Sequence, residues 1–377
     1  MNVALVFNVK KESIIEVVSS PSKSVPSSES EKTPPNELNS DKKAIDKYAE
    51  WDTRQTIDAV ARALSLYHEV TLVEADENAY DRLRDGEFDI AFNIAEGMNG
   101  VSREAQVPAM LEFLGIPYTG SDPLTLATCL DKSRTKEILS YHGIATSRFV
   151  VANSFKEVSK APLRYPLFVK PLHEGSSKGI YNSSYVKNAQ ALQREIERIH
   201  DDYEQPALIE EYLPGREFTV ALLGNGNELR VLPPVEIRFD SLPSEALPVY
   251  SYEAKWLWDT KESPIEVFKC PAPIDDSLQA KIENVCRKAF EVLNCRDWSR
   301  IDIRLDSEGE PNIIEVNPLP GILPDPEEHS CFPMASRAAG FNYDQMMNAV
   351  LNAALKRLGL YSAERSLSEG FAQASGM

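Results

Sequence analysis

The residues with the clearest chemical potential in this chain lie between positions 300 and 317. Charged and apolar residues alternate from 300 to 306, and this period-two pattern predicts a half-buried strand. Positions 307–310 have the composition of a turn, and an apolar run resumes after them. The segment therefore predicts a β-hairpin that carries charged side chains on one face.

The register of this hairpin decides which side chains meet. A turn centred between positions 308 and 309 places Asp302 opposite Glu315 and Arg300 opposite Asn317, all on one face. Two carboxylates and an amide oxygen at this spacing would repel one another unless a cation lay between them. Oxygen ligands suit a hard ion such as Mg²⁺, which normally shares its site with substrate phosphates. The opposite face would be covered by Ile301, Ile303, Ile314 and Val316.

An ordinary solvated strand face is the alternative interpretation of these alternating residues. A one-residue slip in the turn would separate the polar side chains and favour that alternative. In the register above, Arg300 lies beside the three oxygen ligands and can hold further negative charge.

The composition limits the class of protein. The chain has 377 residues, 42% of them hydrophobic, which fits two or three domains with a sizeable core. Its net charge of −18 argues against nucleic acid as a main partner, because phosphate backbones bind basic surfaces. Five cysteines without CxxC spacing argue against a disulfide scaffold or a zinc site and fit a reducing cytoplasm. No signal peptide is expected, and no apolar stretch reaches the length that crosses a bilayer.

The N-terminal part alternates strand and helix patterns, which predicts a parallel α/β domain. The expected helix at 52–66 would have Asp52 as its N-cap, with Gln55 closing a capping box. Residues 10–47 interrupt the pattern with clustered Ser, Pro, Glu and Lys, which predicts a disordered insertion. The strands expected here span residues 3–7, 70–73 and 88–94.

The remainder of the chain mixes strands with longer helices, so the overall class is α/β. The expected strands span residues 147–151, 167–170 and 207–212, and the expected helices span 132–142, 189–200, 277–293 and 343–358.

Three further segments have features of a binding site. A strand ends at Lys170, and the loop of small residues after it can offer N–H groups and hydroxyls to phosphate oxygens, although a surface turn is the alternative. Residues 208–218 have the pattern of a strand, a Pro-Gly break and a second strand. Such a segment can serve as a hinge whose backbone contacts an adenine edge and whose Glu217 binds ribose. An ordinary strand–turn–strand is an equally compatible interpretation. Aromatic residues around Lys255 suggest a loop that closes over a site.

The chain leaves the second hairpin strand through Pro and Gly. The backbone near Gly321 and the hydroxyl of Ser330 would border the metal site. His329 next to Ser330 suggests a nucleophile pair, but no third group is apparent that would orient it, so a binding loop is the better interpretation.

Taken in this order, the motifs resemble the ATP-grasp superfamily and, within it, the D-alanine–D-alanine ligases. The resemblance covers roughly residues 85–358. Each motif alone is unspecific, whereas the series at family-like spacing is specific for the fold and for ATP use. The motifs are Pro117–Ser121, Asp131–Lys132, Lys170–Ser177, Glu210–Leu213, Tyr252–Lys255, Arg300–Asp302 and Glu315–Asn317.

The resemblance implies a division of the chain. Residues 1–122 would form an N-terminal pre-ATP-grasp domain that contains the insertion. Two sheet-bearing ATP-grasp parts of α+β character would follow, a central subdomain at 123–215 and a metal-binding domain at 216–360, with a tail at 361–377.

The resemblance also implies a reaction. ATP would lie between the two sheet-bearing parts, where two Mg²⁺ ions, or Mn²⁺ as an alternative, would be held by Asp302, Glu315 and Asn317. A substrate carboxylate would be phosphorylated, and an amine would then attack the acyl phosphate while Arg300 stabilises the tetrahedral oxyanion.

The remaining expected site residues follow from the same resemblance. Ser176 and Lys255 would join Arg300 as catalytic residues. Gly321 and Ser330 would hold the carboxylate of the second substrate. The nucleotide would be bound by Lys132, Lys170, Ser177, Glu210, Glu211, Leu213, Glu217 and Lys255.

Departures from the family pattern fall mostly at the substrate end. The family's Gly-rich N-terminal element, whose Glu grips the amino group of the first D-alanine, is absent, and Asn8–Lys10 and the insertion stand there instead. Trp256 replaces a Tyr that pairs with this Glu and with the loop serine, Ser176, and an indole cannot accept a hydrogen bond. The family's His-Gly pair reads Glu96-Gly97, and Ser102–Glu104 stands where its acidic end would be.

We therefore expect a cytoplasmic ATP- and Mg²⁺-dependent ligase that joins a carboxylate to an amino acid amine, without nucleic acid or membrane partners. Synthesis of D-alanyl-D-alanine is the leading specific prediction. A ligase for another amino acid or acid, as in peptide or natural-product biosynthesis, is the second. A nucleotide-binding regulator that has lost catalysis is the third. The oligomeric state stays open, with a homodimer as one option.

Overall fold

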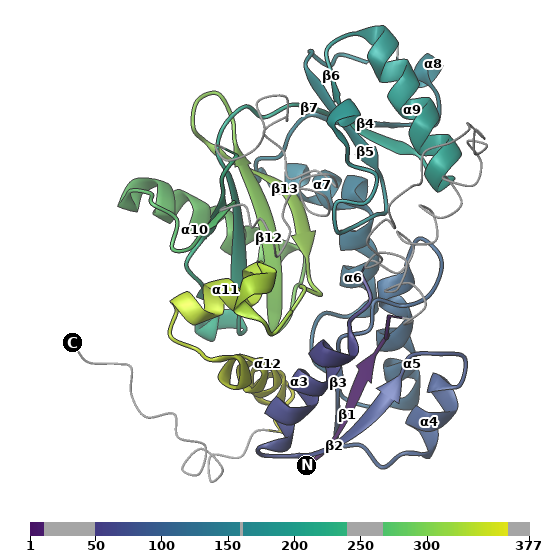
Figure 1. Ribbon diagram of the computed structural model, residues 1–377, viewed down its shortest axis with the longest axis vertical. Coiled ribbons are helices and arrows are strands. Elements are labelled where there is room, and N and C mark those ends of the chain that lie inside the picture. Colours follow the sequence, from purple (N-terminus) through teal and green to yellow (C-terminus); the bar gives the residue numbers. More distant parts are fainter. Residues whose placement is uncertain (11–49, 159–160, 240–266, 361–377) are drawn as a thin grey trace, which may run out of the picture.

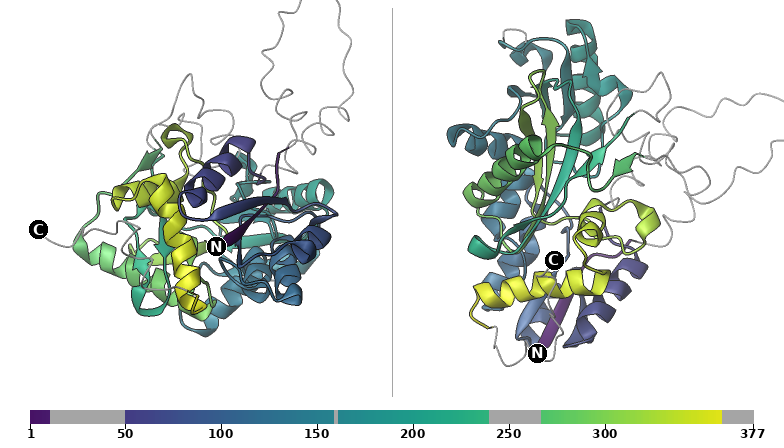
Figure 2. Two further views of the ribbon diagram at one scale, coloured as in Figure 1. Left: turned by 90° about the horizontal axis from the view of Figure 1, so that it is seen from below. Right: turned by 90° about the vertical axis from the view of Figure 1, so that its left-hand side faces the viewer.

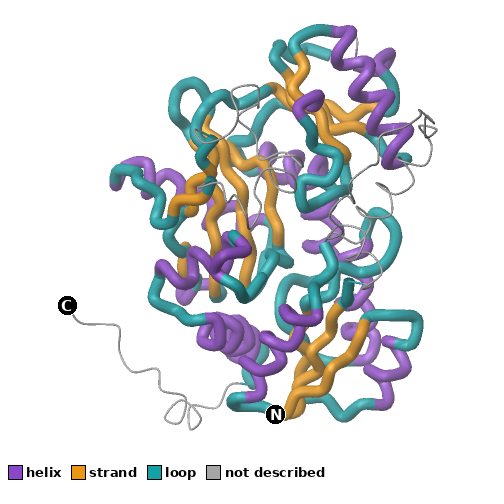
Figure 3. Tube along the Cα trace, in the orientation of Figure 1, coloured by secondary structure: helices purple, strands orange, loops and turns teal. Residues whose placement is uncertain are grey.

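The computed structural model describes residues 1–10, 50–158, 161–239 and 267–360, and its strands form three separate sheets (Figure 1, Figure 3). The expectations for Lys255, Trp256, most of the insertion and the tail fall outside these residues. Within the described ranges, none of the helices combines the length and the apolar character that a membrane span needs.

The N-terminal sheet is parallel, with strand order β2-β1-β3, which confirms the predicted α/β arrangement. Its central strand is apolar and buried from the second residue onward, as expected for a strand covered on both faces. The strands are β1 (Asn2–Phe7), β2 (Glu69–Glu74) and β3 (Ile90–Asn93). The helices are α3 (Arg54–Ser65), α4 (Ala79–Asp85), the 3₁₀ turn η1 (Arg103–Ala105) and α5 (Gln106–Leu114).

Helix α3 begins differently from the prediction. Thr53 is its N-cap, and the hydroxyl of Thr53 accepts a hydrogen bond from the Thr56 N–H at 3.3 Å. Asp52 cannot fill this place because its carbonyl accepts a hydrogen bond from the Lys10 N–H at 2.9 Å, which ties it to the chain after β1. The predicted capping box of Asp52 and Gln55 is therefore wrong, and the Asp52 side chain lines a cavity instead.

The central sheet is antiparallel, with strand order β4-β7-β5-β6. Helix α9 (Ala189–Tyr203) covers it because Leu192, Ile196 and Ile199 recur on one helix face and join the apolar core of this sheet. The strands are β4 (Phe149–Ala152), β5 (Leu167–Pro171), β6 (Tyr185–Val186) and β7 (Ala207–Glu211). The other helices are α6 (Pro123–Leu130), α7 (Lys132–Tyr141), α8 (Phe155–Val158) and the 3₁₀ turn η2 (Asn182–Ser184).

The third sheet contains the predicted hairpin and has strand order β11-β10-β8-β12-β13, with β9 paired to β8. Helix α10 (Asp276–Val292) packs Ile282 and Ala289 into the core on one face of this sheet. Helices α11 (Cys331–Ala338) and α12 (Tyr343–Arg357) belong to the core on its other face. The strands are β8 (Glu217–Leu223), β9 (Arg230–Val231), β10 (Val235–Ile237), β11 (Phe268–Lys269), β12 (Trp298–Leu305) and β13 (Pro311–Asn317), and the 3₁₀ turns are η3 (Gly226–Glu228) and η5 (Pro326–Glu328).

The N-terminal sheet and the third sheet share one apolar core. Helix α12 packs on α3, and Figure 2 shows α12 beside the N-terminal elements. The side-chain amide of Asn348 in α12 donates a hydrogen bond to the Ala63 carbonyl of α3 at 2.8 Å. This packing holds the hairpin in a fixed position relative to β1 and α3.

A buried carboxylate reinforces this junction. Asp297 is fully buried and accepts hydrogen bonds from the Gly120 N–H, the Asn225 amide and the Arg357 guanidinium, each at 2.8 Å. Removing one partner of a buried ion pair leaves an uncompensated charge, so we expect Asp297→Ala to lower the free energy of unfolding by about 3–5 kcal/mol. Denaturant unfolding followed by circular dichroism measures this loss.

The matched control for this variant is Asp58→Ala, which removes an exposed ion pair on the surface of α3. The control should change the free energy of unfolding by less than about 1 kcal/mol. Equal losses in the two variants would contradict a special role for Asp297.

Candidate functional site

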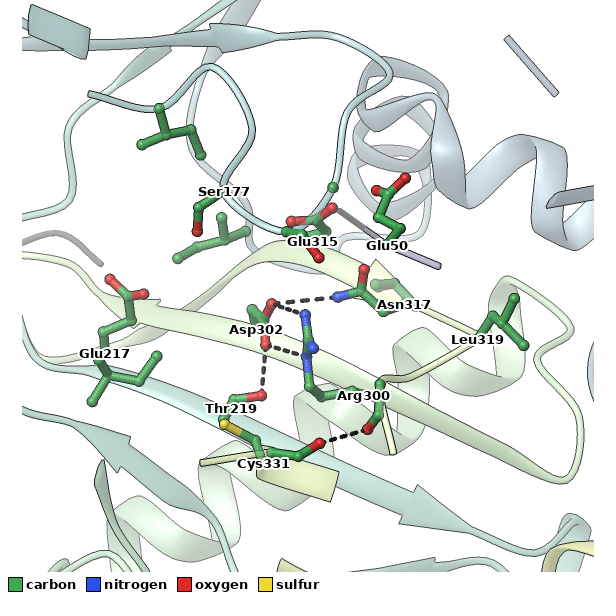
Figure 4. Close-up of a pocket in the computed structure, with 18 of the residues that line it drawn as sticks. Glu50, Ser177, Glu217, Thr219, Arg300, Asp302, Glu315, Asn317, Leu319 and Cys331 are labelled. Carbon is green, nitrogen blue, oxygen red and sulfur yellow. Dashed lines mark hydrogen bonds and ion pairs between the residues drawn. The ribbon is translucent and has the colours of Figure 1, made fainter. Parts of the chain in front are cut away.

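A cavity of about 970 Å³ is lined by side chains from all three sheet-bearing parts. The N-terminal part contributes carboxylates, and the central part contributes one lysine and two glutamates. The third sheet contributes five polar residues of the predicted hairpin, which are Arg300, Asp302, Arg304, Glu315 and Asn317 (Figure 4). The lining residues used below include Asp52, Glu96, Glu104, Lys170, Glu210, Thr219, Arg300, Asp302, Glu315 and Asn317.

The hairpin has the predicted register where the polar residues lie. Asp302 pairs with Glu315 and Arg300 pairs with Asn317 in the antiparallel ladder of β12 and β13. All four residues line the cavity, so the structure brings together the predicted cluster of two carboxylates, an amide and a guanidinium.

A β-bulge next to this cluster contradicts one prediction. The register shifts after Asp302, so that Ile303 pairs with Ile313 rather than with Ile314. Ile313 joins the apolar core on the opposite face of the hairpin, whereas Ile314 lines the cavity together with Glu315. The assignment of Ile314 to the core face is wrong because the bulge places two consecutive side chains of β13 along the cavity.

Arg300 and Asp302 form a two-point ion pair inside the cavity. The Arg300 Nε and Nη2 atoms donate to the two carboxylate oxygens of Asp302 at 3.1 and 3.0 Å. The hydroxyl of Thr219 donates to Asp302 at 2.6 Å, and the amide nitrogen of Asn317 donates at 3.3 Å, as Figure 4 shows. Burial lowers the pKa of Arg300, but the charge of Asp302 outweighs burial and raises this pKa above its usual value. The guanidinium is therefore a fixed and permanently charged group.

The residues present fit a magnesium site that is completed by a substrate. Asp302, Glu315 and Asn317 offer oxygen donors along one wall of the cavity, which is the donor set that Mg²⁺ prefers. Lys132 lies 2.9 Å from Glu315, so a cation already balances this carboxylate. In the part of the chain that the structure describes, no three His, Cys, Asp or Glu side chains are grouped to hold a metal by themselves. An ion at the hairpin would therefore need further oxygen ligands from substrate phosphates.

A second charged cluster surrounds Glu210. Its carboxylate lies 2.6 Å from the Lys136 ammonium and 2.7 Å from the Lys170 ammonium, and it accepts a hydrogen bond from the Ser147 hydroxyl at 2.8 Å. Burial raises the pKa of Glu210, but the two lysines outweigh burial and lower this pKa to about 2. The main effect of Glu210 is therefore to hold the ammonium groups of Lys136 and Lys170 in place. Lys136 is absent from the predicted site, although it follows Lys132 at helical spacing.

The other predicted nucleotide residues lie around the same end of the cavity. Glu211 pairs with Arg164 at 3.3 Å, and Leu213 lines the cavity beside it. Glu217 lies 2.7 Å from Arg304, and burial raises the pKa of its carboxyl.

The predicted loop residues also line the cavity. Ser176 and Ser177 both have left-handed backbone conformations, with φ of 51° and 60°. Such consecutive backbone groups in a turn can form a concave site for anions. At the far end, the Ser330 hydroxyl donates to the Gly321 carbonyl at 2.9 Å.

The N-terminal end of the cavity is more acidic than the sequence predicted. Glu50 and Asp52 lie here together with Glu96 and Glu104. Burial raises the pKa values of Asp52 and Glu104 to about 7, and burial together with neighbouring carboxylates raises the pKa of Glu96 well above its usual value. Glu96 and Glu104 are visible in the sequence as departures from the family pattern. Glu50 gives no local signal there because it directly follows the insertion.

The chain matches a protein-family model over most of the second and third sheets. Residues 137–352 match the D-ala D-ala ligase C-terminus. The D-alanine–D-alanine ligase of Alcanivorax borkumensis is 33% identical over 286 residues, which cover 76% of this chain and 83% of that protein. The uncharacterized protein y4sG of Sinorhizobium fredii is 35% identical over 316 residues, which cover 81% of this chain and 89% of the relative.

A solved structure agrees with these sequence matches. The D-alanine–D-alanine ligase from Bacillus anthracis complexed with ATP has a TM-score of 0.64 and 22% sequence identity, and the likeness covers 95% of this chain and 97% of that chain. At this identity the likeness establishes the fold, and it confirms the predicted ATP-grasp architecture.

Proposed function

This chain belongs to the D-alanine–D-alanine ligase family of ATP-dependent carboxylate–amine ligases, and on that premise we propose that it joins two molecules of D-alanine in an amide bond. The single observation that carries the proposal is the polar face of the hairpin. Arg300, Asp302, Glu315 and Asn317 meet there in one cavity, which Lys132 also borders through its ion pair with Glu315.

The proposed reaction has two steps. A carboxylate oxygen of the first substrate attacks the γ-phosphorus of ATP, ADP leaves, and an acyl phosphate forms. The amine of the second substrate then attacks the acyl carbon, phosphate leaves, and the amine gives up a proton. Arg300 is aligned by Asp302 and stabilises the negative charge that develops on the acyl oxygen in the second step.

The lysines and oxygen ligands would serve the nucleotide. Lys170 lines the cavity and Lys132 reaches it through Glu315, so both lysines would supply positive charge for phosphates. Ser176 and Ser177 would supply hydroxyls and backbone N–H groups. Asp302, Glu315 and Asn317 would hold Mg²⁺, which neutralises phosphate charge when it is bound. Leu213 and Glu217 would border the adenosine, and Gly321 and Ser330 would border the carboxylate of the second substrate.

Phosphate release coupled to ATP turnover, with D-alanine as the sole amino acid, tests this proposal. We expect phosphate, ADP and D-alanyl-D-alanine in equal amounts. No turnover at saturating D-alanine would overturn the choice of substrate. ATP cleavage with some other pair of amino acids would leave the ligase assignment standing.

A ligase with a different first substrate is the second candidate, and the N-terminal end of the cavity favours it because this end departs from the family pattern. Glu96, which stands where the family has a His, lines that end together with Asp52 and Glu104. These carboxylates would attract the ammonium group of an amino acid, whether D-alanine or another. A screen of amino-acid pairs in which D-alanine alone supports ATP cleavage would exclude this candidate. ADP formation with any pair would exclude the third candidate, a regulator without catalysis.

The acidic end predicts a pH dependence. Burial raises the pKa of Asp52 to about 7, and the charge of Lys10 opposes this shift. Among the residues that the structure describes, Glu96 and Tyr343 also interact with Asp52. Since only the ionised carboxylate attracts an ammonium, we expect the KM for the first substrate to rise as the pH falls below about 7, by up to about tenfold per pH unit.

Initial rates across the neutral range, at saturating ATP, measure this dependence. Asp52→Asn should raise the KM for the first substrate at alkaline pH and flatten the profile. Asp58→Asn changes an exposed carboxylate on α3 and should keep the wild-type profile. An unchanged profile in Asp52→Asn would rule out a role for Asp52 in substrate binding.

A further inference from the structure

The loop from Glu174 to Lys178 forms part of the cavity wall. It follows strand β5 of the central sheet and brings Gly175, Ser176 and Ser177 to the cavity. The backbone of this loop is closed by a hydrogen bond from the Lys178 N–H to the Gly175 carbonyl at 2.9 Å.

Glu50 connects this loop to the N-terminal part of the chain. The Glu50 carboxylate lies 3.0 Å from the Lys178 ammonium of the loop and 2.9 Å from the Arg103 guanidinium of the N-terminal part. Arg103 also donates to the His173 carbonyl at 3.0 Å, and Lys178 lies 2.6 Å from the Glu174 carboxylate. Glu50 thus joins the Lys178 end of the loop to Arg103 of η1, and Arg103 in turn holds the chain at His173, just before the loop.

Close packing shows that the carboxylate is seated on the loop. A Cβ atom built on Gly175 would lie only 2.4 Å from the Glu50 Oε1 atom. The absence of a side chain at position 175 therefore makes room for Glu50. The Glu50 side chain is only 10% exposed and lines the same cavity as Ser177 (Figure 4).

The charges make this contact persistent at neutral pH. Burial raises the pKa of Glu50, but the charges of Lys178 and Arg103 outweigh burial and lower this pKa to about 2. Glu50 is therefore ionised throughout the range in which an enzyme is assayed. Movement of the Glu50 carboxylate into solvent is also unfavourable, because it would leave Lys178 and Arg103 without a buried partner.

We propose that Glu50 is a positioning residue that holds the loop 174–178 in its cavity-lining conformation and thereby sets the affinity for the phosphate groups of the nucleotide. This inference rests on the proposed function in one respect, since it assumes that the loop meets the nucleotide. It adds that the carboxylate which holds the loop comes from the N-terminal domain rather than from the central sheet that carries the loop.

Titration calorimetry with a non-hydrolysable ATP analogue and Mg²⁺, without any amino acid, tests the inference. We expect Glu50→Gln to weaken binding of the analogue by about tenfold, because the amide keeps the shape but loses both ion pairs. Under saturating ATP the kcat should change much less than the KM for ATP. The matched control is Glu236→Gln, which changes a buried glutamate that pairs with Arg216 at 2.6 Å on strand β10 and does not line the cavity.

A second pair of variants tests the contact itself. Gly175→Ala should weaken binding of the analogue, since its methyl group would collide with Glu50. In the background of Glu50→Ala the same change should have little further effect, and this non-additivity identifies the contact. Hydrogen exchange of the peptide that contains residues 172–179 should be faster in Glu50→Gln than in the control.

The outcomes separate the two proposals. Wild-type affinity for the analogue in Glu50→Gln would overturn the role of Glu50 and leave the ligase function standing. If the wild-type protein does not bind the analogue, the proposed function fails, and hydrogen exchange still decides whether Glu50 holds the loop. Additive effects of the Gly175 and Glu50 variants would also overturn the inference.

Discussion

Replacing Glu315 with Gln should lower turnover by about 10³-fold, because a metal ion at developing negative charge is worth several kcal/mol. The substitution preserves the size of the side chain and removes one of the two carboxylates that would bind Mg²⁺. It also removes the partner of Lys132, whose ammonium lies 2.9 Å from Glu315. Initial rates of ADP formation as a function of Mg²⁺ concentration measure both effects, and the apparent affinity for Mg²⁺ should fall together with kcat.

Glu310→Gln is the matched control on the same hairpin. Glu310 pairs with Lys281 on the protein surface, with half of its side chain exposed, and lies outside the cavity. The control variant should turn over at the wild-type rate and with the wild-type dependence on Mg²⁺. Full activity in Glu315→Gln would refute the metal assignment, whereas a similar loss in Glu310→Gln would indicate damage to the hairpin.

The hairpin shows what a sequence can predict about a site. Alternation of charged and apolar residues fixes which side chains share a face, and a short turn fixes the register. Arg300, Asp302, Glu315 and Asn317 therefore lie where the pattern places them. The bulge beyond Asp302 cannot be predicted from the alternation of charged and apolar residues, because positions 313 and 314 are both isoleucines and either can fill the core position.

The acidic end of the cavity shows the opposite case. Asp52 has the local pattern of a helix N-cap, but a hydrogen bond from the Lys10 N–H holds its backbone, and that contact spans the whole insertion. The role of Glu50 depends on its contacts with Arg103 and Lys178, which lie 53 and 128 residues further along the chain. Local propensity is a weak predictor wherever distant contacts decide the conformation.

Replacing Arg300 with Lys should lower kcat by about 10²- to 10³-fold, although the positive charge is kept. The guanidinium of Arg300 meets Asp302 through two parallel hydrogen bonds, and an ammonium cannot reproduce this fork. The lysine would therefore lack the fixed direction that stabilises an oxyanion as it forms. Because this stabilisation is specific to the transition state, the KM for ATP should change little. Steady-state rates of dipeptide formation, with ATP and amino acid varied separately, measure the two constants.

Arg304→Lys is the informative comparison, since Arg304 lies on the same strand but makes different contacts. Its guanidinium donates to Glu217 and to the Tyr212 hydroxyl, each at 2.7 Å, at the end of the cavity proposed for adenosine. Arg304→Lys should therefore raise the KM for ATP and leave kcat within a few-fold of the wild type. Opposite patterns in the two variants would locate the bond-forming step at Arg300. If both variants changed only the KM for ATP, Arg300 would be a nucleotide-binding residue, and the oxyanion would have to be stabilised by another group.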